Sequence, residues 1–240
     1  MKHIGIHQYS VEGAVLCFQS IMHESQRRLG EHDHPTVTMT GLAVAPTVPE
    51  WDRREHAALR ARSAEVVDRL AAGGADFFLC PDNTAHIALE AKGPPLALPG
   101  LHIGEVVAGE AASRGFRKVG LLGTSWTMEG PVYPRALGAL GIDQAVPPPA
   151  VRARLHSIIM DELCLHQFEA ASIEFFRATI DALADKGCDS VALVCTEIPL
   201  IISDANSALP TLDSTRLLAH AAVDLALGDR PLPSWRGGPL

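Results

Sequence analysis

Two short segments place reactive side chains directly after an apolar run. Asp82, Asn83 and Thr84 follow residues 77–80, and Cys195, Thr196 and Glu197 follow residues 191–194. A carboxylate and a thiol both exchange protons with bound substrates. Suppose that these two groups lie on opposite sides of a bound carboxylic acid. One group can then remove hydrogen from one face of the α-carbon while the other returns hydrogen to the opposite face. That reaction inverts the stereochemistry at the α-carbon.

The two segments belong to an internal repeat. Residues 74–84 match residues 187–197 at a constant offset of 113, so that Asp82 corresponds to Cys195. The preceding segments share apolar residues at helical spacing and align at the same offset, pairing Val67 with Ile180, Leu70 with Leu183 and Ala71 with Ala184. Short apolar runs at residues 4–6 and 119–122 open the two halves and are typical of buried parallel strands.

Strands that alternate with helices predict an α/β fold, here with two pseudo-symmetric doubly wound parallel-sheet domains that arose by tandem duplication. We expect about four strands in each half. The first domain is predicted to comprise residues 1–97 plus 208–240, with a returning C-terminal helix over residues 215–227, and the second residues 98–207. Ser10 and Ser125 are predicted helix N-caps, and one helix is expected through Tyr133 to Leu140. The Pro- and Gly-rich residues 229–240 predict a loosely held tail.

Ligands of parallel sheets bind beyond the carboxyl ends of the strands, and both repeated turns lie at such an edge. Folding the halves face to face would place Asp82 and Cys195 on opposite walls of one cleft. Their reacting atoms should lie about 6 to 9 Å apart to hold a carbon between them. A ligand carboxylate could rest on the backbone amides of both turns. Glu197 is predicted either to orient a substrate ammonium or to complement a helix dipole, and Cys80 is expected within the sheet core.

Composition excludes several classes of function. The chain has 240 residues, is 47% hydrophobic and carries a net charge of −8 without a basic stripe, which argues against a nucleic-acid partner. No apolar stretch has the length of a membrane span or the form of a signal peptide, so we expect no membrane partner and a cytoplasmic location. The five cysteines form no C-x-x-C pair. The segment His32-Asp33-His34 is predicted to lie in a surface loop, so no metal site is predicted. Motifs for nucleotides or pyridoxal phosphate are absent, so no cofactor is predicted.

The chain resembles the aspartate/glutamate racemase superfamily through residues 83–86 and 195–200, each preceded by a Gly-x-Asp, and through Gly123-Thr124 and residues 212–218. This resemblance covers nearly the whole chain. It implies a cofactor-independent amino-acid racemase, an isomerase with its active site between two domains, that tends to form a homodimer. Cys195 would then be one catalytic acid/base and Asp82 the other. Asn83, Thr84, Thr124 and Thr196 would hold the carboxylate of a small substrate, and Tyr9, Ser10 and Glu197 are further candidates for substrate binding.

Two departures from the superfamily pattern keep alternatives open. Asp82 stands where two-cysteine members carry a second cysteine, and Leu165, followed by His166, stands where some members place a lysine. Without that lysine, aspartate and glutamate are expected to be poor substrates unless Arg53 or Arg54 reaches the pocket. Decarboxylation or isomerisation of a small dicarboxylic acid is one alternative reaction. A non-catalytic protein that binds small carboxylates is an alternative of another class.

Overall fold

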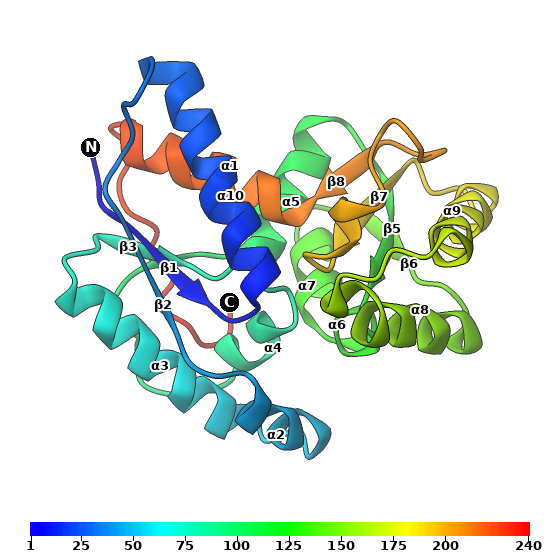
Figure 1. Cartoon of the computed structure of the whole chain (residues 1–240), viewed down its shortest axis with the longest axis horizontal. Coiled ribbons are helices and arrows are strands. Elements are labelled where there is room, and N and C mark those ends of the chain that lie inside the picture. The colour runs from blue at the N-terminus through cyan, green and yellow to red at the C-terminus, as the bar shows by residue number, and fades with distance from the viewer. The chain divides into compact units, whose positions relative to one another are not determined.

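Parallel strands and covering helices alternate along the chain, as the sequence pattern predicts. The computed structural model describes residues 1–240, which form two units (Figure 1). The first unit is Met1–Ile103 with Leu218–Leu240, and the second is Gly104–Leu217. The first unit was expected to end at residue 97 and to resume at residue 208, so the boundaries lie six and ten residues further along the chain. The reason is that the short strand at Gly100–Leu101 pairs with Phe77–Leu79 of the first unit, and the strand at Thr211–Asp213 pairs with Ser190–Val194 of the second.

The first unit holds four parallel strands, five α-helices and one 3-10 turn. Its elements are β1 (Ile4–Gln8), α1 (Val11–Leu29), β2 (Val37–Gly41), a 3-10 turn (Ala45–Thr47), α2 (Val48–Asp52), α3 (His56–Ala72), β3 (Phe77–Leu79), α4 (Ala85–Leu89), β4 (Gly100–Leu101) and most of α10 (Ser214–Leu227). In Figure 1, α1 and α10 lie on one face of this sheet and α3 lies on the other. An ion pair from Arg28 to Asp224 ties α1 to α10, and Arg28 also pairs with Glu24 within α1.

The second unit repeats this arrangement. Its elements are α5 (Ile103–Ser113), β5 (Lys118–Gly123), α6 (Ser125–Glu129), α7 (Val132–Gly138), β6 (Asp143–Ala145), α8 (Pro149–Asp161), a 3-10 turn (Leu163–Leu165), α9 (Ala170–Asp185), β7 (Ser190–Val194), a 3-10 turn (Ile198–Leu200) and β8 (Thr211–Asp213). Apolar side chains of α8 and α9 pack on β5 and β7 in one core. No helix of either unit combines the length and the apolar character needed to cross a membrane.

The two sheets have the same topology. Strand order is β2-β1-β3-β4 in one and β6-β5-β7-β8 in the other, with every pair parallel. In each sheet the chain moves to one side of the first strand and then crosses to the other side. The strand order therefore reverses between β1 and β3, and between β5 and β7. The carboxyl ends of strands at such a reversal are where ligands of open α/β sheets bind.

The repeat predicted from the sequence is visible in the hydrogen bonds that lead into β3 and β7. The Asp76 carboxylate accepts a hydrogen bond from the backbone N–H of His3. At the offset of 113, the Asp189 carboxylate accepts hydrogen bonds from the backbone N–H groups of Arg117 and Lys118. Gly74 and Gly187, two residues before these aspartates, both have positive φ, +87° and +80°. The same turn therefore leads from helix to strand in both units.

Of three local predictions, two differ from the structure and one is confirmed. The N-cap of α6 is Thr124, not Ser125, because the Thr124 hydroxyl accepts the N–H of Thr127 at 3.2 Å. Ser10 does occupy the N-cap position of α1, without a side-chain hydrogen bond to the first turn. The helix expected through Tyr133 to Leu140 is the shorter α7, which ends at Gly138.

The tail prediction was wrong. Trp235 is buried, with 7% of its surface exposed, and its carbonyl accepts the N–H of Gly100 at 2.8 Å. A segment without periodicity can still be held when one large aromatic side chain enters a core and its backbone pairs with a strand edge.

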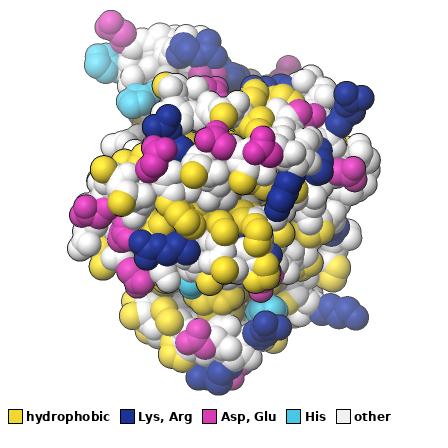
Figure 2. Space-filling model, turned by 90° about the vertical axis from the view of Figure 1, so that its right-hand side faces the viewer, with side chains coloured by type: hydrophobic (Ala, Val, Ile, Leu, Met, Phe, Trp, Pro, Cys, Tyr) yellow, Lys and Arg dark blue, Asp and Glu magenta, His cyan; other side chains and the backbone are white.

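An apolar groove of about 310 Å³ lies on the surface of the second unit. It is lined by residues of α8, α9 and the loop before α8, namely Pro147, Pro148, Val151, Phe175, Ala178, Thr179, Ala182, Leu183 and Lys186. Figure 2 views the molecule from the side of α8 and α9, where hydrophobic side chains gather across the middle of the face. No residue of either repeated turn lines this groove.

Candidate functional site

In the second unit, the residues after β5 and β7 form one cluster. Gly123 pairs with Val194 in the last register position of the two strands, so Thr124 and Cys195 leave the sheet side by side. A Cβ on Gly123 would lie 2.7 Å from the Val194 carbonyl oxygen. Glycine at this position therefore permits the close approach of the two strand ends.

Cys195 and Glu197 form a thiol–carboxylate pair within this cluster. The Cys195 Sγ donates to Glu197 Oε2 at 2.9 Å, and the Thr196 hydroxyl donates to the same oxygen at 3.0 Å. All three residues are buried. This contact was missed at the sequence level, where Glu197 was expected to face a substrate ammonium or a helix dipole. The i, i+2 spacing of acid and thiol in a turn was the available signal.

The environment of Cys195 keeps the thiol protonated. Burial raises the pKa of the Cys195 thiol well above its usual range, and the neighbouring Glu197 carboxylate raises that pKa further by charge repulsion and by accepting the S–H hydrogen bond. The resting thiol is therefore a proton donor at neutral pH.

Thr124 lies beside Cys195 on a fixed backbone. Besides capping α6, the Thr124 hydroxyl shares a 3.1 Å hydrogen bond with the hydroxyl of Thr127. Ser125, the residue after it, donates its backbone N–H to His156 Nδ1 at 3.3 Å. The start of α6 is thus held on two sides at the edge of the cluster.

In the first unit, Asp82, Asn83 and Thr84 form the corresponding turn after β3. Asp82 Oδ1 accepts the N–H of Ala85 at 2.8 Å, which is a helix-capping contact, while the Asp82 carbonyl accepts from His86 Nδ1 at 2.8 Å. Asp82 and Thr84 are half-buried and Asn83 is buried. Asp82 therefore stays partly exposed in the turn that follows β3.

Tyr9 and Ser10 follow β1 at this same edge. The Tyr9 hydroxyl donates to Thr47 Oγ1 at 3.3 Å and accepts from Trp51 Nε1 at 2.7 Å. Burial raises the pKa of Tyr9 to about 12, and the charge of Asp82 contributes to the increase. The structure thus brings Tyr9 and Asp82 into the same electrostatic environment, as expected from their positions after neighbouring strands.

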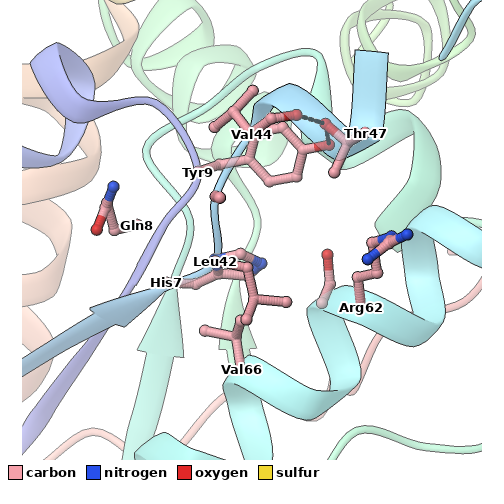
Figure 3. A pocket seen from close by; sticks show the side chains of 10 residues that line it. His7, Gln8, Tyr9, Leu42, Val44, Thr47, Arg62 and Val66 are labelled. Atoms are coloured by element: carbon pink, nitrogen blue, oxygen red, sulfur yellow. Dashed lines mark hydrogen bonds between the residues drawn. The ribbon is translucent and has the colours of Figure 1, made fainter. Parts of the chain in front are cut away.

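A small pocket, with a free volume of about 10 Å³, opens beside Tyr9 (Figure 3). Its lining residues come from the ends of β1 and β2 and from α3, and they are His7, Gln8, Tyr9, Leu42, Ala43, Val44, Thr47, Arg62, Ser63 and Val66. Burial lowers the pKa of His7 to about 4, so this imidazole is neutral at pH 7. In Figure 3 the Tyr9 ring lies over one side of the pocket and Val66 lies on the other.

Arg62, the arginine that lines this pocket, is paired with a carboxylate. Arg62 donates three hydrogen bonds to Glu50, at 2.7, 2.9 and 3.1 Å. Arg53, one of the two arginines considered as a partner for a second substrate carboxylate, donates to Glu55 at 2.7 and 3.0 Å. The pocket therefore presents little uncompensated positive charge.

Other candidates from the sequence lie apart from these turns. Cys80 is fully buried, which raises the pKa of its thiol, as expected for a core residue. Leu165 is exposed and precedes His166, which has a left-handed backbone. His32, Asp33 and His34 lie on an exposed loop, and no group of three or more His, Cys, Asp or Glu side chains is arranged to hold a metal ion.

Comparison with known proteins relates these turns to a family. A family model for Asp/Glu/hydantoin racemases matches residues 9–222. The chain is 26% identical over 157 residues to the broad specificity amino-acid racemase RacX of Bacillus subtilis (strain 168), a match that covers 64% of this chain and 66% of the relative. The chain therefore spans just under two thirds of that relative.

Solved structures share the fold. One is a Yersinia pestis protein proposed to be an Asp/Glu racemase, with a TM-score of 0.83, 26% identity, and coverage of 95% of this chain and 100% of that chain. Another is an aspartate racemase homologue from Pyrococcus horikoshii OT3, with a TM-score of 0.77, 24% identity, and coverage of 95% and 100%. With the family model matched over residues 9–222, the chain belongs to the Asp/Glu/hydantoin racemase family.

Proposed function

We propose that the protein is a cofactor-independent amino-acid racemase that inverts the α-carbon by two-base proton transfer, with Cys195 and Asp82 acting on opposite faces. The observation that carries the proposal is the protonated, buried Cys195 thiol at the end of β7, at the repeat position that Asp82 occupies after β3. Family membership and the named racemase relatives support the reaction class.

In the proposed step, the Asp82 carboxylate takes the α-hydrogen as a proton, and the electron pair of the C–H bond passes into the substrate carboxylate as an enolate. The Cys195 S–H then delivers its proton to the opposite face of the α-carbon and becomes a thiolate. Glu197, which accepts the S–H hydrogen bond at 2.9 Å, holds the thiol proton in place before the transfer. Inversion results because the proton lost and the proton gained are on opposite faces.

The two bases are unequal. The reference pKa values of Asp and Cys differ by about 4.6 units, or roughly 6 kcal/mol in proton affinity, and burial of Cys195 raises its pKa further. The resting enzyme therefore holds an Asp82 carboxylate and a Cys195 thiol. This protonation state can act on the enantiomer whose α-hydrogen faces Asp82. Turnover of the other enantiomer requires the rarer state with the proton on Asp82.

Substrate binding is assigned to the polar side chains around the two bases. We assign the substrate carboxylate to Asn83, Thr84, Thr124 and Thr196, and place Tyr9 and Ser10 beside it. These residues follow the strands at the two reversal points of strand order, which supports the assignment.

The preferred substrate carries an uncharged side chain. The pocket beside Tyr9 has a neutral His7, and Arg62 is already paired with Glu50. A second substrate carboxylate placed there would lose its hydration without gaining a free cation, which is costly. We therefore expect neutral amino acids to be turned over better than aspartate or glutamate.

The alternative reaction is decarboxylation of a small dicarboxylic acid, and the protonated state of Cys195 is the observation in its favour. There the bond from the α-carbon to one carboxylate breaks, carbon dioxide leaves, and Cys195 protonates the resulting enolate. This reaction needs one proton donor and no second base. It also needs a site for two substrate carboxylates, which the paired arginines make less favourable.

Incubation in deuterium oxide distinguishes these reactions. The assay uses a panel of neutral and acidic amino acids and a panel of substituted malonates, followed by NMR and chiral chromatography. Racemisation gives α-deuterium with inversion, whereas decarboxylation gives α-deuterium with loss of carbon dioxide. No exchange with any compound would leave the non-catalytic binding protein and contradict the proposal.

Variants then assign the bases. Cys195→Ser should abolish α-proton exchange, because a serine hydroxyl is a far weaker acid than a thiol. Asp82→Cys should retain or raise racemisation, since it equalises the two proton affinities. Cys188→Ala is the matched control, because Cys188 is buried in the same unit and lies outside the turn. A Cys195→Ser variant within a few fold of wild type would mean that the thiol is structural.

The homodimer and the cytoplasmic location expected from the sequence remain proposals. Light scattering during size-exclusion chromatography tests the first, and fractionation of the native cells tests the second.

A further inference from the structure

A cluster of buried rings underlies the Asp82 turn in the first unit. It consists of His86, His102 and Trp235, which have ring centroids 4.6 to 6.0 Å apart and are all buried. His86 belongs to α4, His102 follows β4, and Trp235 comes from the segment after α10. We propose that Trp235 is a positioning residue, which acts through His86 to hold the Asp82 turn in the geometry that proton transfer requires.

His86 connects the ring cluster to the turn by hydrogen bonds. Its Nδ1 lies 2.8 Å from the Asp82 carbonyl oxygen, which can only accept, and its Nε2 lies 3.3 Å from the backbone N–H of Ile103, which can only donate. The proton is therefore on Nδ1 and the ring is neutral. This arrangement fixes both the tautomer and the plane of the ring.

Trp235 supports the face of that ring. The two rings are nearly parallel, at 13° and 6.0 Å between centroids, while His102 meets Trp235 edge-on at 4.8 Å. His102 is buried, and its Nε2 lies 2.9 Å from Glu90 Oε1. Rotation of His86 away from the Asp82 carbonyl would therefore have to displace an indole that is packed on a second buried ring.

The segment that carries Trp235 is fixed to the sheet edge by its backbone. Leu96 donates to the Arg236 carbonyl, Gly100 to the Trp235 carbonyl, and Gly238 to the Leu89 carbonyl, each at 2.8 Å. The indole N–H of Trp235 donates to the Gly238 carbonyl at 3.0 Å. Such a set of contacts holds the indole far more firmly than its place in a Pro- and Gly-rich segment would suggest.

Gly100 makes room for this packing. A Cβ at position 100 would lie 2.5 Å from the ring of Phe78 and 3.0 Å from that of Trp235. Phe78 belongs to β3, the strand that ends at the Asp82 turn, and its ring stacks on Trp235 with centroids 6.0 Å apart. Trp235 thus touches the strand before the turn and the helix after it.

This inference rests on the proposed role of Asp82 as a base, so its test has one readout that needs no activity. Hydrogen exchange of the peptide covering residues 82–90 reports whether the turn has loosened, since Ala85 donates its N–H to Asp82 Oδ1. Trp235→Phe keeps an aromatic face against His86, whereas Trp235→Leu keeps apolar bulk without the ring. His86→Phe keeps a ring but removes the hydrogen bond to the Asp82 carbonyl.

We expect Trp235→Leu and His86→Phe to speed exchange in this peptide and to lower racemisation ten- to a hundredfold, because misplacing a reacting group by about 1 Å costs rates of that order. Trp235→Phe should stay within about threefold of wild type. Ile21→Ala, a truncation of a fully buried residue of α1 in the same unit that lies outside the core cluster containing Trp235, is the control for general destabilisation. It should leave exchange of residues 82–90 and turnover close to wild type at a temperature where all variants are folded.

A second kinetic readout separates positioning from general loss of structure. With α-deuterated substrates, slower proton transfer at Asp82 should raise the primary isotope effect for the enantiomer that Asp82 deprotonates and lower it for the other. Equal isotope effects for both enantiomers, or unchanged turnover in Trp235→Leu despite faster exchange, would overturn the positioning role. Faster exchange in Trp235→Leu combined with a wild-type enzyme that racemises nothing would instead overturn the proposed function.

Discussion

Replacing Glu197 with Gln should make the Cys195 thiol markedly more reactive in the absence of any substrate. Glu197 Oε2 lies 2.9 Å from Cys195 Sγ and accepts its proton in a hydrogen bond. Once the thiol ionises, two negative charges face each other at that distance, and this repulsion is part of what raises the thiol pKa. Glutamine removes the charge, so the thiol pKa should decrease and more thiolate should exist at a given pH below it.

The size of the effect follows from the short contact. At 2.9 Å and an effective dielectric constant of about 20, the repulsion is about 6 kcal/mol. If half of it is relieved, about 3 kcal/mol, the thiolate population increases by roughly a hundredfold. A less basic thiolate is also less nucleophilic, and its rate constant for alkylation falls by about tenfold when the thiolate population increases by about a hundredfold. We therefore expect alkylation of Cys195 to be about tenfold faster in Glu197→Gln at pH 7.

The assay is timed alkylation by iodoacetamide, read by mass spectrometry of the peptide that contains Cys195. Cys188 in the same digest is an internal reference, since it is buried in the same unit and lies outside the cluster. Glu174→Gln is the matched variant, because Glu174 pairs with Arg177 on the surface of α9. A rate for Glu197→Gln within twofold of wild type, or slower, would show that Glu197 is not an ionised neighbour of the thiol and would refute the reasoning.

Three further predictions test other parts of the structure. Gly123→Ala should lower the free energy of unfolding by about 1 to 3 kcal/mol in urea denaturation, because its Cβ would meet the Val194 carbonyl oxygen at 2.7 Å. Glu24→Gln should lower stability by about 1 to 2 kcal/mol at pH 7. Hydrogen bonds from arginines lower the pKa of Glu24 from 4.5 to about 2 in the folded state, so its contribution is present above pH 4.5 and is lost as the pH falls toward 2. Glu50→Gln should shift kcat/KM toward aspartate over neutral amino acids, because it removes the negative charge that now neutralises Arg62.

Each of these has a control. Gly109→Ala, where no atom lies within 4 Å of the added Cβ, should be neutral or stabilising. A Glu24→Gln deficit that persists unchanged at pH 2 would mean that its ionised form contributes nothing. Glu55→Gln, which frees Arg53 outside the pocket lining, should leave the substrate preference unchanged. If Glu50→Gln leaves it unchanged as well, the pocket beside Tyr9 does not receive the substrate side chain.

Much of the fold could be predicted because it is encoded twice. The offset that aligns Asp82 with Cys195 also aligns Gly74 with Gly187, and the structure shows the same strand order in both sheets. Apolar runs and helical spacing are local properties, so they predict strands and helices without knowledge of the rest of the chain. Errors fell at element ends, such as the N-cap of α6, where one hydroxyl contact decides the boundary, and in the segment after α10, where Trp235 is buried.

The candidate site divides in the same way. Its reactive residue types and their place after β3 and β7 were evident from the sequence, since each set directly follows an apolar run typical of a buried parallel strand. The contact between Cys195 and Glu197 was not, because a side chain two residues along a turn can face either way. The pairing of Arg62 with Glu50 joins two helices and depends on how α2 packs against α3.

The sequence by itself determined the duplicated α/β units, the chemistry available at their turns, and the presence of an aspartate at residue 82 where the other half of the repeat carries Cys195. These follow from residue identity, periodicity and offset, which need no long-range contact. Only the tertiary structure decided that Glu197 keeps the thiol protonated, that Arg62 in the pocket beside Tyr9 is neutralised, and that Trp235 is buried beside His86. The first depends on which way a side chain turns within one loop, and the other two depend on how side chains from different elements pack. No local pattern specifies which neighbour a buried side chain will meet.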